Sequence, residues 1–310
     1  MQALERLGLP EAQRADVDGP VHYREWTGPA DGPTFVLVHG LGGSLLNWSP
    51  VAPGLALRGR VLALDLGGFG LTPLGGRQTG VGANLRLLDG FLRSLGLPPV
   101  VLVGNSMGGM ITLAQCARAP GTVERMVLVD AAFPRYPGKA ARVSPRVAAG
   151  FAAVGLGGEA FARWVMGSRS RRLGAEGLVR ETLALCTPNP SSIDPVLVEA
   201  MIEAVELRSR SEEATLAFIR ATRSIVQTQI RPARYRELVR AASRPALVIH
   251  GGRDVLVPVE AAGIAAAGHA DWELCVFPDL GHIPMMEAPD RWLAAVGSWL
   301  DRTRAEAASV

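Results

Sequence analysis

A serine in a glycine-rich turn is the residue of this sequence with the clearest chemical potential. Ser106 lies in the pentapeptide GNSMG, residues 104–108, between the apolar run VVLV and the helix-like segment MITLAQCA. Glycines two residues to either side of a serine allow a tight turn from strand to helix, because a side chain at either place would collide within the turn. Such a turn projects the hydroxyl above the sheet. The pattern therefore predicts that Ser106 is a nucleophile.

A serine hydroxyl needs a base to remove its proton at neutral pH. The sequence has five histidines, and His282 lies after the last apolar run and before a helical segment. This context predicts a loop at the same end of the sheet as Ser106. His22, His250 and His269 lack the context and are interpreted as structural. We therefore predict that His282 is the general base.

The base needs an acid that orients it, and this acid should also follow a strand. Asp254 ends the motif GGRD after one apolar run, whereas Asp130 ends an earlier run in LVD. The glycines before Asp254 and the chain order Ser, Asp, His favour Asp254. Asp130 stays an alternative for the acid.

The motif HGLGG, residues 39–43, follows an early apolar run. Its glycines, Gly40 among them, let the backbone approach a ligand closely, so that His39 serves loop geometry. The backbone N–H groups of Leu41 and of Met107, at a helix start, are the expected oxyanion donors.

These residues need a scaffold that brings distant loops together, and the hydrophobic pattern predicts one. Short apolar runs bounded by Gly and Pro alternate with helical segments, as in parallel strands joined by crossover helices. Strands are expected at 34–39, 60–66, 100–104, 123–130, 246–251 and 272–278, with a further strand of an N-terminal hairpin at 22–26. Helices are expected at 84–95, 106–118, 259–267 and 288–302. The predicted class is α/β, with strands buried on both faces.

The alternation breaks between residues 133 and 231, where amphipathic stretches such as 159–166 and 195–208 follow one another without strands. We predict a mostly helical insertion, a cap, in a core made of residues 1–132 and 232–310. The substrate would lie between sheet and cap.

Five residues are candidates to contact the substrate. Phe133 and Trp164 would make its pocket apolar if they face inward, although ordinary packing explains them as well. Trp48 would either wall the pocket or staple a helix. Gly40 and Ile283, beside the two catalytic loops, complete the candidates.

Composition excludes several other classes of function. The net charge of +3 comes from scattered basic residues among 29 acidic ones, so that no nucleic-acid-binding surface is expected. Three widely spaced cysteines and the absence of metal-ligand or phosphate-loop motifs predict no metal and no cofactor. No secretory signal and no apolar run of about 18–20 residues is present, so a cytoplasmic protein without stable membrane insertion is expected.

Four motifs together resemble those of the α/β-hydrolase superfamily: HGLGG, GNSMGG, GGRD and GHIPMMEAP, in this order. The resemblance covers nearly the whole chain outside the insertion. It implies the α/β-hydrolase fold, with a mostly parallel sheet flanked by helices, a triad of Ser106, Asp254 and His282, and an oxyanion hole at Leu41 and Met107. Gly67 is a departure, because proline is usual there in the family.

The resemblance also limits the classes of reaction that we expect. A serine nucleophile argues against the family's epoxide hydrolases and haloalkane dehalogenases, which use aspartate. GNSMGG also occurs in hydrolases of carbon–carbon bonds, but these typically carry HGSGPG and a tryptophan after the catalytic histidine, where this chain has HGLGGS and Ile283. We predict an esterase- or lipase-like enzyme that cleaves a carboxylic ester of a small or medium apolar substrate through an acyl-enzyme. Carbon–carbon bond hydrolysis and a low-turnover ligand-binding or receptor role are the alternatives.

Overall fold

One mixed sheet forms the centre of the computed structural model, which describes residues 2–136, 145–209 and 212–308. Within these residues eight strands are joined in the order β1-β2-β4-β3-β5-β6-β7-β8. The strands are β1 (Ala12–Asp16), β2 (Pro20–Trp26), β3 (Thr34–Val38), β4 (Arg60–Leu64), β5 (Val100–Asn105), β6 (Val123–Val129), β7 (Ala246–Gly251) and β8 (Trp272–Phe277).

Strands β3 to β8 are mutually parallel, whereas β2 is antiparallel to both β1 and β4. The predicted α/β class, the six parallel strands and the N-terminal hairpin are thereby confirmed. Several strands end one or two residues earlier than predicted, because residues such as His39 already belong to the loops that carry the candidate site.

The strands are buried on both faces, which explains their continuous apolar runs. In β3, Val36 and Val38 belong to one hydrophobic cluster, while Phe35 and Leu37 belong to another on the opposite face. All four side chains lack exposed surface. Alternate residues of a strand point to opposite faces, so a strand between two helical layers must be apolar throughout.

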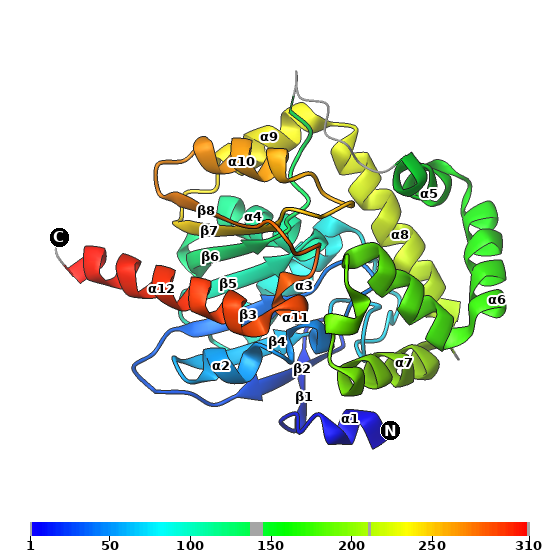
Figure 1. The fold of residues 1–310 in the computed structure, drawn as a ribbon, viewed down its shortest axis with the longest axis horizontal. Coiled ribbons are helices and arrows are strands. Elements are labelled where there is room, and N and C mark those ends of the chain that lie inside the picture. Colours follow the sequence, from blue (N-terminus) through cyan, green and yellow to red (C-terminus); the bar gives the residue numbers. More distant parts are fainter. Residues whose placement is uncertain (1, 137–144, 210–211, 309–310) are drawn as a thin grey trace.

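Two layers of helices supply the partners of these faces (Figure 1). The first cluster includes side chains of α3 (Val81–Ser94), α4 (Met107–Arg118), α9 (Pro232–Arg240) and α10 (Val259–Ala267). The second includes α2 (Ala52–Ala56), α11 (Pro284–Glu287) and α12 (Pro289–Ala308). Short 3-10 turns lie at Leu45–Trp48, Pro120–Thr122 and Pro190–Ser192.

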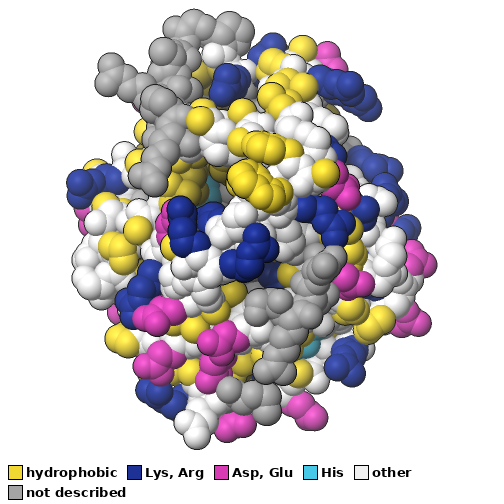
Figure 2. Space-filling model, turned by 90° about the vertical axis from the view of Figure 1, so that its right-hand side faces the viewer, with side chains coloured by type: hydrophobic (Ala, Val, Ile, Leu, Met, Phe, Trp, Pro, Cys, Tyr) yellow, Lys and Arg dark blue, Asp and Glu magenta, His cyan; other side chains and the backbone are white. Residues whose placement is uncertain are grey.

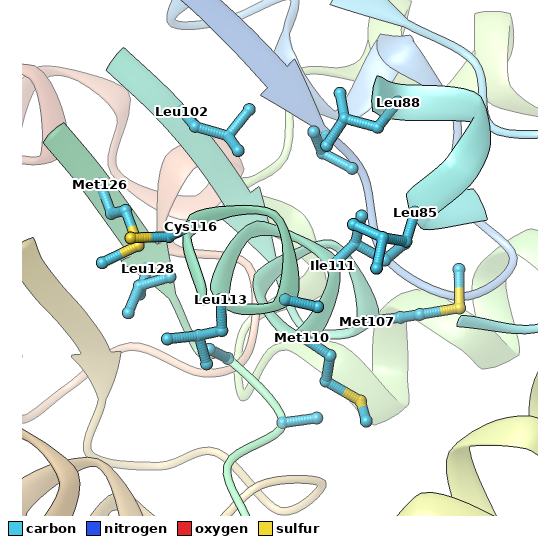
Figure 3. Close-up of a cluster of buried hydrophobic side chains, with 14 of the residues drawn as sticks. Leu85, Leu88, Leu102, Met107, Met110, Ile111, Leu113, Cys116, Met126 and Leu128 are labelled. Atoms are coloured by element: carbon cyan, nitrogen blue, oxygen red, sulfur yellow. The ribbon is translucent and has the colours of Figure 1, made fainter. Parts of the chain in front are cut away.

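Helix α4 is buried almost completely between its neighbours. Figure 3 shows its side chains Met110, Ile111 and Leu113 among those of α3, β5 and β6. Cys116 has no exposed surface in this cluster, and burial raises the pKa of its thiol. Cys116 is therefore a packing residue of this cluster.

A second group of helices lies beside the sheet, at the right of Figure 1. It comprises α5 (Pro145–Leu156), α6 (Glu159–Cys186), α7 (Pro195–Ser209) and α8 (Glu212–Gln229), and α1 (Gln2–Arg6) packs on α7. The sequence predicted helix only at 159–166 within α6, which continues for 28 residues with a non-helical residue at Gly174. Residues 137–144 and 210–211 of the predicted cap lie outside the described residues.

None of the helices in the described ranges is long and apolar enough to cross a membrane.

The burial of the tryptophans predicts a large difference in their contribution to stability. Trp292 of α12 has no exposed surface and its ring centroid lies 6.3 Å from that of Trp48. Trp292→Ala should lower the free energy of unfolding in urea by about 3–5 kcal/mol, because it leaves a cavity. Trp164→Ala, at a side chain that is 65% exposed, should lower the free energy of unfolding by about 1 kcal/mol or less. Equal losses would contradict this account of the core.

Candidate active site

The turn that carries Ser106 joins the end of β5 to the start of α4. Ser106 has a φ of 54° and a ψ of −111°, one of the few described non-glycine residues with a positive φ. A Cβ atom at Gly104 would lie 2.4 Å from Thr112 Oγ1, and one at Gly108 would lie 2.2 Å from the Val38 oxygen. The turn therefore requires both glycines, for the steric reason expected, and strain of this kind is typical of functional residues.

Asn105, which the sequence argument did not single out, ties the Ser106 turn to the loop of His282. Its Nδ2 donates hydrogen bonds of 3.1 Å both to the Val129 oxygen and to the His282 backbone oxygen. The side chain is buried, so these bonds are shielded from water. The structure thus brings together two loops 176 positions apart in the chain, which only the sheet topology could reveal.

His282 and Asp254 form a hydrogen-bonded pair. The distance from His282 Nδ1 to Asp254 Oδ2 is 2.7 Å, and Asp254 Oδ1 accepts the N–H groups of Leu256 and Val257. Burial by itself would raise the pKa of Asp254, but the charge and hydrogen bond of His282 and the Val257 N–H hold that pKa below its usual value. Asp254 is therefore a carboxylate, and Nε2 is the nitrogen of His282 left for exchange with a substrate or nucleophile.

Asp130 lies behind this pair. It follows β6 with a φ of 44°, and its Oδ1 accepts the Gly251 N–H at 2.9 Å. Of the two acids proposed from sequence, Asp254 is the one hydrogen-bonded to His282.

The loop after β3 packs directly against Ser106. A Cβ atom at Gly40 would lie 3.1 Å from the Ser106 Cβ, so glycine allows this close approach. Leu41 is half-buried in that loop, and Met107 is the first residue of α4, where helix N–H groups lack intrahelical partners. Of the two predicted oxyanion donors, Met107 directly follows Ser106 and Leu41 directly follows Gly40, which contacts Ser106.

His39 holds the same loop in place. Its Nδ1 donates to the Gly40 oxygen at 2.7 Å and its Nε2 accepts the Leu66 N–H at 3.0 Å. Burial lowers the pKa of His39, in keeping with a neutral ring that donates at one nitrogen and accepts at the other. His39 therefore acts on loop geometry, as expected from sequence.

Asp65, in the loop after β4, is a buried anchor that sequence reasoning did not identify. Its carboxylate accepts His22 Nδ1 at 2.7 Å and the N–H groups of Leu45 and Leu71 at 2.8 and 2.7 Å. One charged side chain thereby joins β2 to the two loops that follow β3 and β4.

The predicted substrate-binding residues occupy different environments. Phe133 and Ile283 are buried, with exposed fractions of 3% and 4%, in the loops after β6 and after β8. Trp48 is fully buried, and its ring packs against that of Trp292 on α12. Trp164 is 65% exposed and stacks on Phe161, which is also exposed. The condition stated for Trp164, that it face inward, is not met, because most of its side chain is exposed.

The C-terminal end of α6 and the residue after it reach the His282 loop. The His282 N–H donates to the Cys186 oxygen at 2.6 Å. The carboxylate of Glu287 accepts the Gly281 and Ile283 N–H groups and the hydroxyl of Thr187. The His282 loop is therefore held partly by two residues of the predicted cap, Cys186 and Thr187.

Arg208 brings a positive charge from α7 to the loop after β4. Its guanidinium donates to the Gly68 oxygen at 2.6 Å and lies 5.4 Å from the centroid of the Phe69 ring. Burial lowers its pKa, while the charge of Asp65 opposes that shift. Phe69 in turn packs edge-on against His39, beside the Gly40 loop.

One group of described residues has the composition of a metal site, namely Asp130, His250 and Asp254, with one potential ligand atom from each within 4.8 Å of the others. His250 Nε2 already donates to the Val257 oxygen, and Asp254 is engaged with His282. We interpret the group as a hydrogen-bonded network behind His282.

The thiol of Cys186, whose pKa burial raises to about 12, is protonated at neutral pH and does not serve as a nucleophile.

Comparison with known proteins gives a family match over most of the chain. The model of the alpha/beta hydrolase fold family matches residues 33–289. The 2-hydroxymuconate semialdehyde hydrolase of Pseudomonas sp. (strain CF600) is 28% identical over 282 residues, which cover 88% of this chain and 89% of that protein. The dihydrolipoyllysine-residue acetyltransferase component of the acetoin cleaving system of Pseudomonas putida is 26% identical over 91% of this chain and 67% of its own length.

Solved structures share the fold. A thermophilic esterase from Thermogutta terrifontis superposes with a TM-score of 0.68 at 23% identity, covering 94% of this chain and 98% of the esterase.

The hydrogen bonds of Asp65 predict a loss of stability in acid. Burial would raise the pKa of Asp65, but the hydrogen bonds from His22 and the Leu71 N–H hold it below its usual value. A depressed native pKa contributes stability that is present above the unfolded-state pKa of about 3.9 and is lost as pH falls through the native value. Asp65→Asn should therefore weaken the decline in unfolding free energy below pH 4.

The same substitution should lower the free energy of unfolding at pH 7 by on the order of 3 kcal/mol, since it leaves buried donors unpaired. Asp31→Asn, on an exposed loop, is the matched control. Urea unfolding between pH 3 and pH 7 measures both effects. Wild-type stability of the Asp65→Asn variant at pH 7 would show that Asp65 is not an anchor.

Proposed function

The chain belongs to the α/β-hydrolase family, whose model matches residues 33–289, and on that premise we propose that it is a serine hydrolase acting on a small-molecule carboxylic ester. Family membership makes the protein a hydrolase; the ester and the apolar character of a small or medium substrate are our proposal. The observation that carries it is the 2.7 Å hydrogen bond between His282 and Asp254, held beside the strained Ser106 turn by Asn105.

In the proposed reaction, Ser106 Oγ attacks the ester carbonyl while His282 Nε2 takes its proton. Asp254 fixes the Nδ1–H tautomer of His282 and stabilises the imidazolium. The N–H groups of Leu41 and Met107 would donate to the developing oxyanion. His282 then protonates the leaving alcohol, and a water molecule, activated by His282 in turn, releases the acid from the acyl-enzyme.

We further propose that residues 133–231 form a helical cap over this site. The bond from the His282 N–H to the Cys186 oxygen supports a direct contact between cap and catalytic loop. Figure 2, a view from the side of α5 to α8, shows hydrophobic side chains interspersed with basic ones on this face. Gly40, Phe133 and Ile283, next to the catalytic loops, are the proposed substrate contacts.

Carbon–carbon bond hydrolysis is the second candidate, and Arg208 favours it. A partly buried guanidinium near the Gly40 loop can bind a carboxylate. The 28% identical relative is named for a semialdehyde substrate derived from muconate, a dicarboxylate. A substrate that carries a carboxylate beside the scissile bond would use this cation.

Active-site labelling tests the serine mechanism. A fluorophosphonate probe should label the wild-type protein stoichiometrically and should not label Ser106→Ala. Hydrolysis of a short-chain p-nitrophenyl ester should fall by roughly 10³-fold or more in that variant. Ser192→Ala, at an exposed serine, should behave as the wild type. Labelling that survives Ser106→Ala would exclude Ser106 as the nucleophile, and absent turnover with ligand-induced stabilisation would favour the receptor alternative.

The charge of Arg208 predicts a preference between substrates. Arg208→Gln should lower kcat/KM about 10- to 100-fold for a monoester of a dicarboxylic acid, since a hydrogen bond to a charged group contributes about 1.5–3 kcal/mol. The neutral diester of the same acid should change less than about threefold. Arg169→Gln, at an arginine paired with Glu181 on α6, is the control. Equal losses for both esters would mean that Arg208 does not recognise a carboxylate.

A further inference from the structure

A second carboxyl group lies buried behind the catalytic pair. Strands β6 and β7 are adjacent and in register, with Val129 opposite Ile249. The next residues, Asp130 and His250, therefore lie side by side and have no exposed surface. His250 Nε2 is 3.6 Å from Asp130 Oδ1 and also 3.6 Å from Asp254 Oδ2.

The hydrogen bonds around Asp130 do not stabilise a negative charge on its carboxyl group. Its Oδ1 accepts the Gly251 N–H, but its Oδ2 has no donor among the described residues. His250 donates its Nε2–H to the Val257 oxygen at 3.0 Å, so that 3.6 Å to Asp130 is too long for a second strong bond. A buried carboxylate with a single neutral donor is destabilised, because one hydrogen bond does not offset the free energy of its desolvation.

We propose that Asp130 is a neutral carboxylic acid whose O–H donates a hydrogen bond to the Asp254 carboxylate, making Asp130 a positioning residue for Asp254 and His282. This inference rests on the proposed triad, in which Asp254 orients His282. It adds a fourth member to the chain from Ser106 through His282 and Asp254.

The charges and burial around Asp130 favour a state in which Asp130 and Asp254 together carry one proton. Burial, the charge of Asp254 and the hydrogen bond to it raise the pKa of Asp130 well above its usual value, and Glu287 adds to the effect. The other titratable neighbours provide no cation: burial lowers the pKa of His250 and raises that of the Cys186 thiol, so both are neutral at pH 7. Two carboxyl groups in one buried site ionise one at a time.

A neutral donor has a specific advantage at this place. Asp254 Oδ1 is held by two backbone N–H groups and Oδ2 by His282, so an additional O–H fixes the rotation of the carboxylate. An ionised Asp130 would instead place a second negative charge beside Asp254, where it would further stabilise a positive charge on the catalytic base. The difference between these two states can be measured.

Asparagine is the neutral isostere that separates these states. Asp130→Asn keeps an acceptor for the Gly251 N–H and a donor for Asp254, and kcat should stay within about threefold of wild type. The apparent pKa in the acidic limb of kcat/KM should be unchanged, because no charge is removed. Asp130→Ala should lower kcat about tenfold at constant KM, since the donor is lost. Asp279→Asn, at an exposed aspartate paired with Arg291, is the control.

Infrared difference spectroscopy gives a readout that needs no turnover. The wild-type protein and Ser106→Ala at pH 7 should both show the C=O stretch of a protonated carboxylic acid, and Asp130→Asn should lack it. A missing band, or an apparent pKa that falls by about one unit in Asp130→Asn, would overturn the proposal by showing an ionised Asp130. Since the band is seen without catalysis, failure of the ester-hydrolase proposal would leave this test intact.

Discussion

The strained turn at Ser106 is the constraint around which the rest of the structure is arranged. A positive φ at a residue with a side chain is unfavourable by about 1–3 kcal/mol, and it persists only where the surroundings leave no alternative. Here β5 lies in the middle of the sheet and α4 is buried on nearly all sides. The contact of Gly108 with the Val38 oxygen then leaves no room for the turn to relax. Core packing therefore maintains the strain at the site.

Buried carboxyl groups organise the loops at the strand ends. Asp65 joins the loops after β3 and β4, Glu287 holds the loop of His282, and Asp254 orients its ring. Each carboxylate accepts backbone N–H groups as well as side-chain donors, which offsets the cost of its burial. Asp130 differs because, among the described residues, its Oδ1 accepts one backbone N–H and its Oδ2 has no donor, and on this ground we proposed that it carries a proton.

The helices beside the sheet contribute to the same site. The Cys186 oxygen binds the His282 N–H, and Arg208 lies over Phe69 near the loop of Gly40. Under the proposed function, movement of these helices would change both the orientation of the His282 loop and the charge that a substrate meets. The proposal thus assigns specificity to the segment between β6 and β7, and the geometry of the reaction to the sheet and its turns.

The sequence by itself determined the sheet, the Ser106 turn and the pairing of His282 with an acid after a strand, because each depends on local sterics and hydrophobic periodicity. It left Asp254 and Asp130 as alternatives, since both follow strands. Only the tertiary structure decided between them, by placing Asp254 at 2.7 Å from His282. It also decided the positions of Asn105, Arg208 and Trp164, because their contacts join segments far apart in the chain or depend on which face of a helix is covered, and local pattern carries no information on either.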